Sequence, residues 1–551
     1  MKNQSFIKSI LYNNKFIFPC LLFACIWIYI FISTRIFEAG FNYFIDDHQI
    51  FIFNNKKFDL YEIIIEPFSS LLSNVPKARF RPLYEILLSL FSQVYGLNPV
   101  LWYLSSLIIA ITTTTNFYIF ARLQSFPILE SICFSLLVVF GDQASTYARF
   151  GTPETTATFF TSFALIFGSL NVNNTKRHIL LDYLFLFFAI LAAFNKEACI
   201  LMLPAFAFFR VWFYSHKNKV SINQSILNNK YIVFFILSIF FLLIAYIKLS
   251  GVTGPGYAGV DRETFSASKI FGLINFLIAR TSLAFAIVIN IIYFILCLKN
   301  NRLNAFNSGL YILTGLIVIP QLILYSKSGI GFHYLLPCVV GISFLTVYPI
   351  IEIKKLFSKY FSILTLLVLL IAFQNVVATY NHFIYVSNRL NNVQEMVRSI
   401  SLCLQKESQL IIFGNPYVHY ETLYGFKKAI IDHILKSNKD DFFLATYGYS
   451  NTNLKSESFK ENEKSWTFLK VDDVEGWYNH KTFNTLSKDQ LNHTQGIVIL
   501  GFNEFENDFK KLTSDWFYPD KFNYTYYQQI DISLYCKRDI DSSPQDSQTN
   551  R

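Results

Sequence analysis

The sequence predicts a multi-pass helical membrane protein that ends in a small polar α/β domain, and three observations support this prediction. Of the 551 residues, 53% are hydrophobic and only 15% are charged, whereas about 25% of the residues of a soluble domain carry a charge. The mean hydropathy of +0.36 is too high for a disordered chain. Apolar runs of about 20 residues, the length that crosses a bilayer, recur until about residue 380, where a polar part rich in Asn and Lys begins. With 21 Gly and 15 Pro, the composition excludes collagen-like and Pro-rich scaffolds.

About eleven apolar runs are candidates for transmembrane helices. The first run follows Lys2, Lys8 and Lys15 and has no small-residue cleavage site, so we interpret it as an anchor rather than a removed signal peptide. The run at 127–141 is short, and the stretch 179–214 allows more than one division. The predicted spans are 16–34, 99–120, 127–141, 154–170, 179–194, 197–214, 231–249, 270–298, 307–326, 333–352 and 359–378.

The positions of the basic residues predict the orientation of these spans, because cytoplasmic loops are enriched in Lys and Arg. With the N-terminus in the cytoplasm, most basic loop residues fall inside, and an odd number of spans places the C-terminal part outside the cytoplasm. The inner loops then contain Arg122, Lys176, Arg177, Lys217, Lys219, Lys230, Lys299, Arg302, Lys354 and Lys355. Membrane topology thus explains the net charge of +10. Since no basic patch or base-stacking module occurs, we expect no nucleic acid partner.

Two regions are more than connectors. The first outer loop, 35–98, contains LYEIIIEPFSSLL and PLYEILLSLFSQVYG, which are too short or too interrupted to span. We expect both to lie as helices in the membrane interface. The C-terminal part contains short buried-type strands near 409–414 and 496–501 and a helical stretch near 419–436, which together predict an α/β domain. The predicted domains are the transmembrane domain 1–379, the extracytoplasmic domain 380–539 and a disordered tail 540–551.

The eight cysteines predict no metal centre, because no CxxC motif or Cys/His cluster of zinc spacing occurs. Six of them lie in or beside apolar runs, where packing is their expected role. Cys403 and Cys536 lie in the polar part, and they form a disulfide only if that part faces an oxidising compartment. We expect no cofactor. A divalent metal at His48, beside Asp46 and Asp47, is an alternative.

Five polar clusters lie on the outer side in this topology. Ionisable groups at membrane depth are costly, so each is a functional candidate by default. The clusters are Asp46-Asp47-His48, Arg79-Phe80-Arg81-Pro82-Leu83, Arg149-Phe150-Gly151-Thr152-Pro153-Glu154, Asn195-Lys196-Glu197, and Lys327 with His333 and Tyr334.

Cations and carboxylates on one membrane face suit a specific chemistry. Cations hold the charge of a lipid phosphate, and Arg does so with a planar fork of donors. A carboxylate takes the proton of an acceptor hydroxyl as the hydroxyl attacks. Because phosphate is already a good leaving group, the set suits sugar transfer from a polyprenyl-phosphate donor to an acceptor whose identity the sequence leaves open.

Three stretches of the chain resemble a known group of proteins. They are IDDHQIFIFNN, FRPLYEILLSLFSQVYGLNPVLWYLSS and FNKEACILMLP. These look like the GT-C membrane glycosyltransferases, over roughly residues 10–340. The resemblance is closest to the protein O-mannosyltransferases and the TPR-containing transmembrane O-mannosyltransferases, in a branch with the aminoarabinose transferases. It implies a GT-C-like helix bundle, a polyprenyl-phosphate-linked sugar donor, an acidic catalytic base in the first outer loop, and inversion at the anomeric carbon.

The resemblance also implies roles for individual residues. Asp47 matches the catalytic base, with Asp46 orienting it or the acceptor. The residues expected to contact donor phosphate are Arg81, Arg149, Lys196 and His333, and those expected to contact sugar or acceptor are Glu154, His48 and Glu197. His333 stands where many relatives have Arg before Tyr, so this position departs from the family pattern. No TPR pattern follows, so the protein acceptors of the eukaryotic relatives are not implied.

Structural roles remain open for each of these residues. An Asp pair after a span is often a helix cap. The alternative role of Arg79 and Arg81 is to anchor the chain at the interface, with the charged end of each side chain among the lipid headgroups. Two structural ion pairs are a further alternative, Arg149 with Glu154 and Lys196 with Glu197. The alternative functions are a transporter or flippase of lipid-linked saccharides and an inactive GT-C-like scaffold. The span centres are nearly free of charge, which favours the enzyme over a transporter. The missing TPR pattern and the absence of a eukaryotic retention signal favour a bacterial inner membrane.

Overall fold

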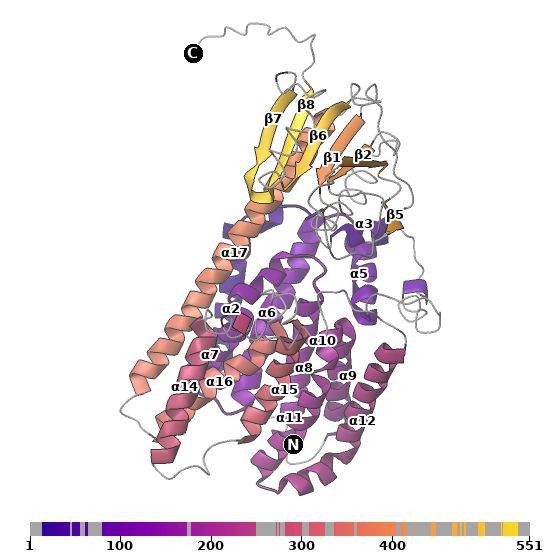
Figure 1. The fold of residues 1–551 in the computed structure, drawn as a ribbon. Coiled ribbons are helices and arrows are strands. Elements are labelled where there is room, and N and C mark those ends of the chain that lie inside the picture. Colours follow the sequence, from indigo (N-terminus) through magenta and orange to yellow (C-terminus); the bar gives the residue numbers. More distant parts are fainter. Residues whose placement is uncertain are drawn as a thin grey trace. The chain divides into compact units, whose positions relative to one another are not determined.

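The computed structural model consists of two compact units, Met1–Phe37 with Lys57–Val386 and Glu38–Lys56 with Ser387–Arg551 (Figure 1). The first unit contains the helical membrane region, and the second contains a β-sheet and the segment around Asp47. The first unit ends at Val386, and the segment 38–56 belongs with the C-terminal residues. The structure describes residues 14–43, 47–55, 61–63, 80–173, 178–249, 271–272, 275, 281–299, 308–325, 336–356, 361–403, 409–414, 422, 425, 442–447, 466–470, 474–475, 479–480, 494–501, 520 and 522–537.

Every predicted apolar run overlaps a helix. Among the described residues, six helices are long and apolar enough to cross a membrane, or seven if a bent pair counts as one span, and three shorter apolar helices accompany them. The protein is therefore an integral membrane protein. The helices of this unit are α2 (Asn14–Ser33), α5 (Pro82–Tyr95), α6 (Pro99–Leu123), α7 (Ile128–Val139), α8 (Pro153–Asn173), α9 (Ile179–Asn195), α10 (Glu197–Ile200), α11 (Leu203–Asn218), α12 (Ile222–Leu249), α14 (Thr281–Lys299), α15 (Ser308–Tyr325), α16 (Leu336–Leu356) and the first part of α17 (Phe361–Cys403).

Proline marks the start of the helices that surround the site. Pro82, Pro99 and Pro153 are the first residues of α5, α6 and α8, a position where the missing N–H costs nothing and the fixed φ suits a helix. Asn98 caps α6, because its side chain accepts a hydrogen bond from the Val100 N–H. These three helix N-termini are thus set locally by the sequence.

The short predicted run at 127–141 is a broken span. Helix α7 is followed by the 3₁₀ helix η2 (Asp142–Ala148), and the two are bent by 66°. The break lies at Gly141, whose φ of +113° favours glycine. The Gly141 N–H donates to Thr379 Oγ1 on α17 at 2.8 Å. The bend sends the chain through η2 to Arg149 and the start of α8.

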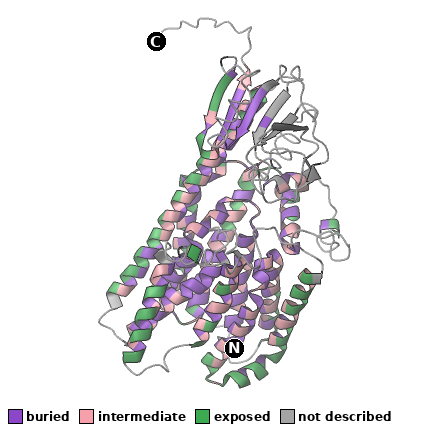
Figure 2. Ribbon diagram, in the orientation of Figure 1, coloured by how far each residue is buried: buried purple, intermediate pink, exposed green. Residues whose placement is uncertain are grey.

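Aromatic side chains fill the interior of the helical unit. Trp27 stacks on Phe140 with 4.5 Å between the ring centroids, and its Nε1–H donates to Thr114 at 2.9 Å. Figure 2 shows buried residues through the interior and exposed residues along α12 and α14. The exposed residues include large apolar side chains such as Phe234, as expected where a helix faces lipid.

Helix α5 coincides with the second predicted interfacial helix. It buries Tyr84 and Leu88 on one face and exposes Val94, and it is not among the helices that pass as spans. Of the first predicted interfacial segment, only Tyr61, Glu62 and Ile63 lie inside the described residues.

The second unit is built on a mixed six-stranded sheet of order β3-β2-β1-β6-β8-β7. The central strand β1 pairs in parallel with β2 and β6, and the outer pairs are antiparallel. Both predicted strands are present as β1 and β6, whereas most of the predicted helix 419–436 lies outside the described residues. The strands are β1 (Gln409–Gly414), β2 (Phe442–Tyr447), β3 (Trp466–Lys470), β6 (Thr494–Leu500), β7 (Phe522–Tyr527) and β8 (Ile532–Lys537), with a separate pair β4 (Val474–Glu475) and β5 (Asn479–His480).

Helix α17 passes without a break from the first unit into the second. With 43 residues it is about 65 Å long, roughly twice the thickness of the hydrocarbon core. Its last turns are polar and contain the sequence NRLNNVQEMVRS. Two further short helices, η1 (Ile36–Glu38) and α3 (His48–Asn55), lie in or next to the segment of the second unit that carries Asp47.

Candidate active site

Four charged residues predicted as site residues meet in the helical unit. Lys196 and Glu154 form an ion pair in which each side chain is less than 5% exposed. Beside it, Arg81 Nε lies 3.0 Å from Glu197 Oε2. The N-terminal turn of α8 supplies Glu154, the turn from α9 into α10 supplies Lys196 and Glu197, and Arg81 precedes α5.

Glu197 holds the start of α5 in place. Its Oε1 accepts the Phe80 N–H at 3.0 Å while its Oε2 accepts Arg81 Nε–H. The carboxylate therefore binds a backbone group and the neighbouring guanidinium together. The carboxylates of Glu197 and Glu154 raise the pKa of Arg81 although burial opposes them, so Arg81 stays charged.

In the buried pair of Lys196 and Glu154, the loss of hydration on burial and the attraction between the two charges act on the pKa of Lys196 in opposite directions. Burial lowers the pKa of Lys196, while the Glu154 carboxylate raises it and Arg81 lowers it. Removal of one partner from such a pair leaves the other buried without compensation. Taken together, two cations and two carboxylates leave this cluster without net charge.

A small half-open pocket adjoins the cluster and contains Arg149. Its volume is about 40 Å³, and Arg149 is the only charged residue among those that line it. Within the described part of the chain no carboxylate pairs with Arg149. The walls come from α5, α6 and the start of α8, namely Tyr84, Leu87, Leu88, Phe91, Trp102, Ser105, Ser106, Ile109, Gly151, Thr152, Thr155 and Thr156.

The pocket and the charged cluster share supporting residues. Thr156 lines the pocket and donates to Asn195 Oδ1 at 2.7 Å, and Asn195 directly precedes Lys196. Gly151 has a φ of +58°, and a Cβ there would lie 2.9 Å from Leu88 Cδ1. The left-handed φ therefore favours glycine at this position, where the loop approaches the Leu88 side chain of α5.

Asp47 lies in the second unit, in the turn before α3. It is 4% exposed, and its Oδ2 accepts the Asn42 N–H at 2.6 Å. Next to it, burial raises the pKa of Tyr43, a hydrogen bond with Gln394 lowers it and the Asp47 charge raises it. The residue predicted as the base is thus held by backbone and lies near an aromatic hydroxyl that stays protonated.

The remaining predicted residues divide into two groups. The structure brings Arg81, Glu154, Lys196 and Glu197 together and places Arg149 in the adjoining pocket. It pairs Glu154 with Lys196 rather than Arg149, and Glu197 with Arg81 rather than Lys196. Outside the described residues lie Asp46, Arg79, Lys327, His333 and Tyr334, together with the side chain of His48. The described residues contain no group of three or more His, Cys, Asp or Glu side chains arranged to hold a metal ion.

Sequence reasoning missed a second buried ion pair. Arg210 on α11 is 1% exposed and binds Asp182 Oδ1 at 3.0 Å, Asn229 Oδ1 at 2.9 Å and the Gly168 carbonyl at 3.0 Å. The signal was available, because Arg210 interrupts the apolar run LPAFAFFRVWF and such residues are rarely exposed to lipid. Glu154 starts α8 and Gly168 lies near its end, so about 20 Å of helix separates the two networks.

Comparison with known proteins gives a likeness to solved structures and no match to known sequences. No protein-family model matches the chain, and no curated protein sequence matches it. The solved structures that match include the crystal structure of ArnT from Cupriavidus metallidurans bound to undecaprenyl phosphate, with 10% identity and a TM-score of 0.46. That alignment covers 95% of this chain and 99% of the other.

Proposed function

We propose that the protein is a membrane glycosyltransferase that moves a sugar from a polyprenyl-phosphate donor to an acceptor on the extracytoplasmic face. The observation that carries this proposal is a half-open pocket with Arg149 as its only charged lining residue, beside the cluster of Arg81, Glu197, Lys196 and Glu154. The apolar walls suit the start of an isoprenoid chain, and the cation suits a phosphate. Two further cations, Lys196 and Arg81, lie in the charged cluster next to this pocket.

Charge balance assigns the phosphate contact to Arg149 first. Arg81 and Lys196 are each paired with a carboxylate, so they add little net attraction for an anion. Arg149 in the pocket adds an unbalanced positive charge among the described residues. When the sugar leaves, the donor phosphate changes from a diester with one negative charge to a monoester with nearly two, and preorganised cations stabilise that developing charge.

The size of the pocket limits what it holds. At about 40 Å³ it has room for roughly three water molecules, so it accepts a group of the size of a phosphate and not a polyprenyl chain. Leu87, Leu88 and Phe91 of α5 and Trp102 of α6 form its apolar side, while the serine and threonine hydroxyls lie on α6 and α8. The rest of the lipid therefore remains in the bilayer.

Asp47 is the proposed general base. The acceptor hydroxyl gives its proton to the Asp47 carboxylate as its oxygen attacks the anomeric carbon, and the bond from that carbon to the donor phosphate oxygen breaks. The bonding electrons leave with the phosphate, so the product is a polyprenyl phosphate and the sugar is inverted. Glu154, Glu197, His48 and Asp46 are the proposed sugar, acceptor or orienting groups, and His333 is a proposed further phosphate contact.

The site is proposed to face outward from a bacterial inner membrane. The N-terminus is then cytoplasmic and the sheet domain extracytoplasmic. In support, Cys403 and Cys536 form a disulfide, and disulfides persist in oxidising compartments. No metal or other cofactor takes part in the proposed reaction.

A comparison of host strains tests the function. A strain without the protein is complemented with wild type, with Asp47→Asn or with Asp520→Asn, and its glycolipids, glycans and glycoproteins are profiled by mass spectrometry. Asp520 is exposed and serves as a matched control. We expect one sugar modification to be absent from the null strain and from Asp47→Asn and present in the other two. If Asp47→Asn restores that modification, Asp47 is not the base, and the same test is made on Asp46→Asn. If both variants restore it, a transporter of lipid-linked saccharides or an inactive scaffold becomes the favoured function.

A further inference from the structure

The segment that carries Asp47 packs in the same unit as the C-terminal residues, although most of the helical membrane region separates them in sequence. Residues 38–56 form one compact unit with residues 387–551. The contact runs through α17, where Gln394 reaches back to a loop that lies about 350 residues earlier in the chain.

Gln394 makes two hydrogen bonds to this loop. Its Nε2 donates to the Phe41 carbonyl at 3.0 Å, and its Oε1 accepts the Tyr43 hydroxyl at 3.2 Å. Gly40 has a φ of +73°, and a Cβ there would lie 2.7 Å from Gln394 Nε2. The loop backbone therefore lies directly against the amide, and its left-handed φ favours glycine at this position.

The Phe41 carbonyl and the Asn42 N–H belong to one peptide unit. Gln394 binds the carbonyl end, and Asp47 Oδ2 binds the N–H end at 2.6 Å. Hydrogen bonds at both ends of a peptide polarise it and strengthen one another. The orientation of the Asp47 carboxylate is thus linked to α17 through a single peptide.

Three aromatic rings enclose this link. Phe41 and Tyr43 each pack on Phe51 of α3, with centroids 5.3 Å and 5.5 Å apart. All three side chains are buried. The rings hold the loop from both sides of Asp47, because Tyr43 precedes it and Phe51 follows it.

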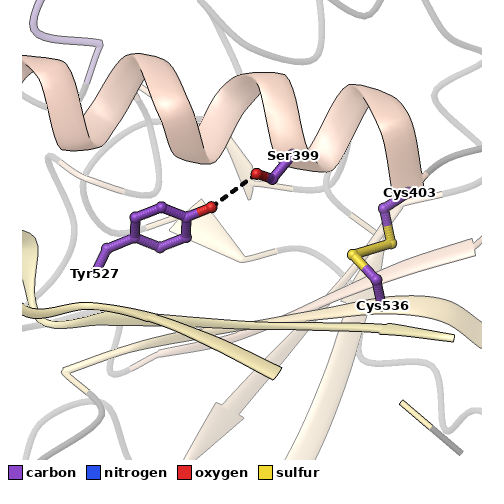
Figure 3. The surroundings of a disulfide bond; sticks show 4 residues. All are labelled: Ser399, Cys403, Tyr527 and Cys536. Carbon is purple, nitrogen blue, oxygen red and sulfur yellow. Dashed lines mark hydrogen bonds between the residues drawn. A yellow bond between two sulfur atoms is a disulfide. The ribbon is translucent and has the colours of Figure 1, made fainter. Parts of the chain in front are cut away.

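The sheet domain in turn holds the end of α17. The Tyr527 hydroxyl donates to Ser399 Oγ at 2.9 Å, and Cys403 and Cys536 form a disulfide, as Figure 3 shows. Asn392 adds a hydrogen bond to Gln529 at 2.9 Å. The helix face towards the domain is buried at Val393, Met396 and Ile400. Strands β7 and β8 therefore fix the part of α17 from which Gln394 projects.

We propose that Gln394 is a positioning residue for Asp47, and that the sheet domain serves as the support which keeps α17 and Gln394 in place. This inference rests on the proposed role of Asp47 as the general base. In this proposal the sheet domain contributes to catalysis by holding Gln394 in position, although the domain itself supplies no catalytic residue.

Hydrogen exchange on the full-length protein tests the link without reference to activity. The variants are Gln394→Ala, which loses both hydrogen bonds, Tyr43→Phe, which loses one, and Arg398→Ala, at an exposed residue of α17, as a control in the same unit. We expect amide exchange in the peptide 38–56 to rise at least about tenfold in Gln394→Ala, less in Tyr43→Phe and not in Arg398→Ala. Exchange in β6 and β8 should stay at the wild-type rate in all three.

Steady-state kinetics with the sugar donor found in the strain comparison provides the second measurement. We expect kcat of Gln394→Ala to fall about tenfold with the donor KM within about twofold, because binding is left intact and only the base is displaced. Unchanged exchange in Gln394→Ala would overturn the link, whatever the activity. Raised exchange with wild-type kcat would overturn the positioning role. Full activity of Asp47→Asn would instead overturn the base assignment, and the exchange result would still decide whether the link exists.

Discussion

Gln394 and Asp47 hydrogen-bond to opposite ends of the same peptide unit, the one between Phe41 and Asn42. The two side chains never need to touch, yet a shift of the helix that carries Gln394 displaces the backbone N–H that Asp47 accepts. This loop therefore packs with residues of the C-terminal unit that lie about 350 positions later in the chain.

Arg149 is predicted to dominate binding of the lipid phosphate. Arg149→Ala removes the one charged group among those that line the pocket, and a charge-assisted hydrogen bond contributes about 1.5–3 kcal/mol. We therefore expect undecaprenyl phosphate to bind the purified variant roughly 10- to 100-fold more weakly, as measured by native mass spectrometry or fluorescence titration. Arg149→Lys should recover part of the affinity.

The matched control for Arg149 is Arg398, an exposed arginine on α17. Arg398→Ala should bind the lipid like wild type. If Arg149→Ala does the same while Arg81→Ala binds weakly, the phosphate lies on the charged cluster instead of in the pocket.

Lys196 and Glu154 are predicted to be coupled in stability. Lys196→Met leaves a buried carboxylate without its partner and should destabilise the protein by about 3–5 kcal/mol. Adding Glu154→Gln removes that unpaired charge, so the double variant should be more stable than Lys196→Met alone. Thermal unfolding in detergent measures both, and additive losses in the double variant would contradict the coupling.

The sequence predicted the membrane helices better than the pairing of the charges. An apolar run predicts a helix because, in lipid, the backbone N–H and C=O groups of each segment must be hydrogen-bonded within that segment. Pro82, Pro99 and Pro153 predict helix starts because the preference of proline for the first helical position is also local. Lys196 and Glu197 are adjacent and suggested a pair with each other, but each binds a residue of another element. Such choices depend on how α5, α8 and α9 pack, which no local pattern encodes.

Gln394 shows the same limit more strongly. A glutamine in a polar helical stretch carries no signal, and its partners lie about 350 residues away in sequence. Arg210 is the contrasting case, because an arginine inside an apolar run is a signal by itself. Its partner Asp182 begins another apolar helix, and the two could have been matched as opposite charges on one side of the membrane.

The ion pair of Arg210 and Asp182 is predicted to support the fold and not the pocket. Arg210 is buried and bonds to α8, α9 and α12, so Arg210→Met should lower the melting temperature strongly, at a cost of about 3–5 kcal/mol. Below that melting temperature, affinity for undecaprenyl phosphate should stay within about twofold of wild type, because about 20 Å of α8 separates the pair from the pocket. If folded Arg210→Met, below its melting temperature, binds the lipid more weakly than wild type, the two ends of α8 are coupled.

The disulfide between Cys403 and Cys536 is predicted to form in the native protein and to stabilise the C-terminal unit. The two residues are 133 positions apart with Cα atoms 5.5 Å from each other, and closing a long loop by a disulfide contributes about 2–5 kcal/mol. Protein purified without reductant and alkylated under denaturing conditions should therefore keep these two cysteines unmodified, whereas the six others are modified. Cys403→Ser with Cys536→Ser should lower the melting temperature and raise amide exchange in the last turns of α17. Alkylation of both cysteines in unreduced protein would contradict the bond, and with it the argument that the sheet domain lies outside the cytoplasm.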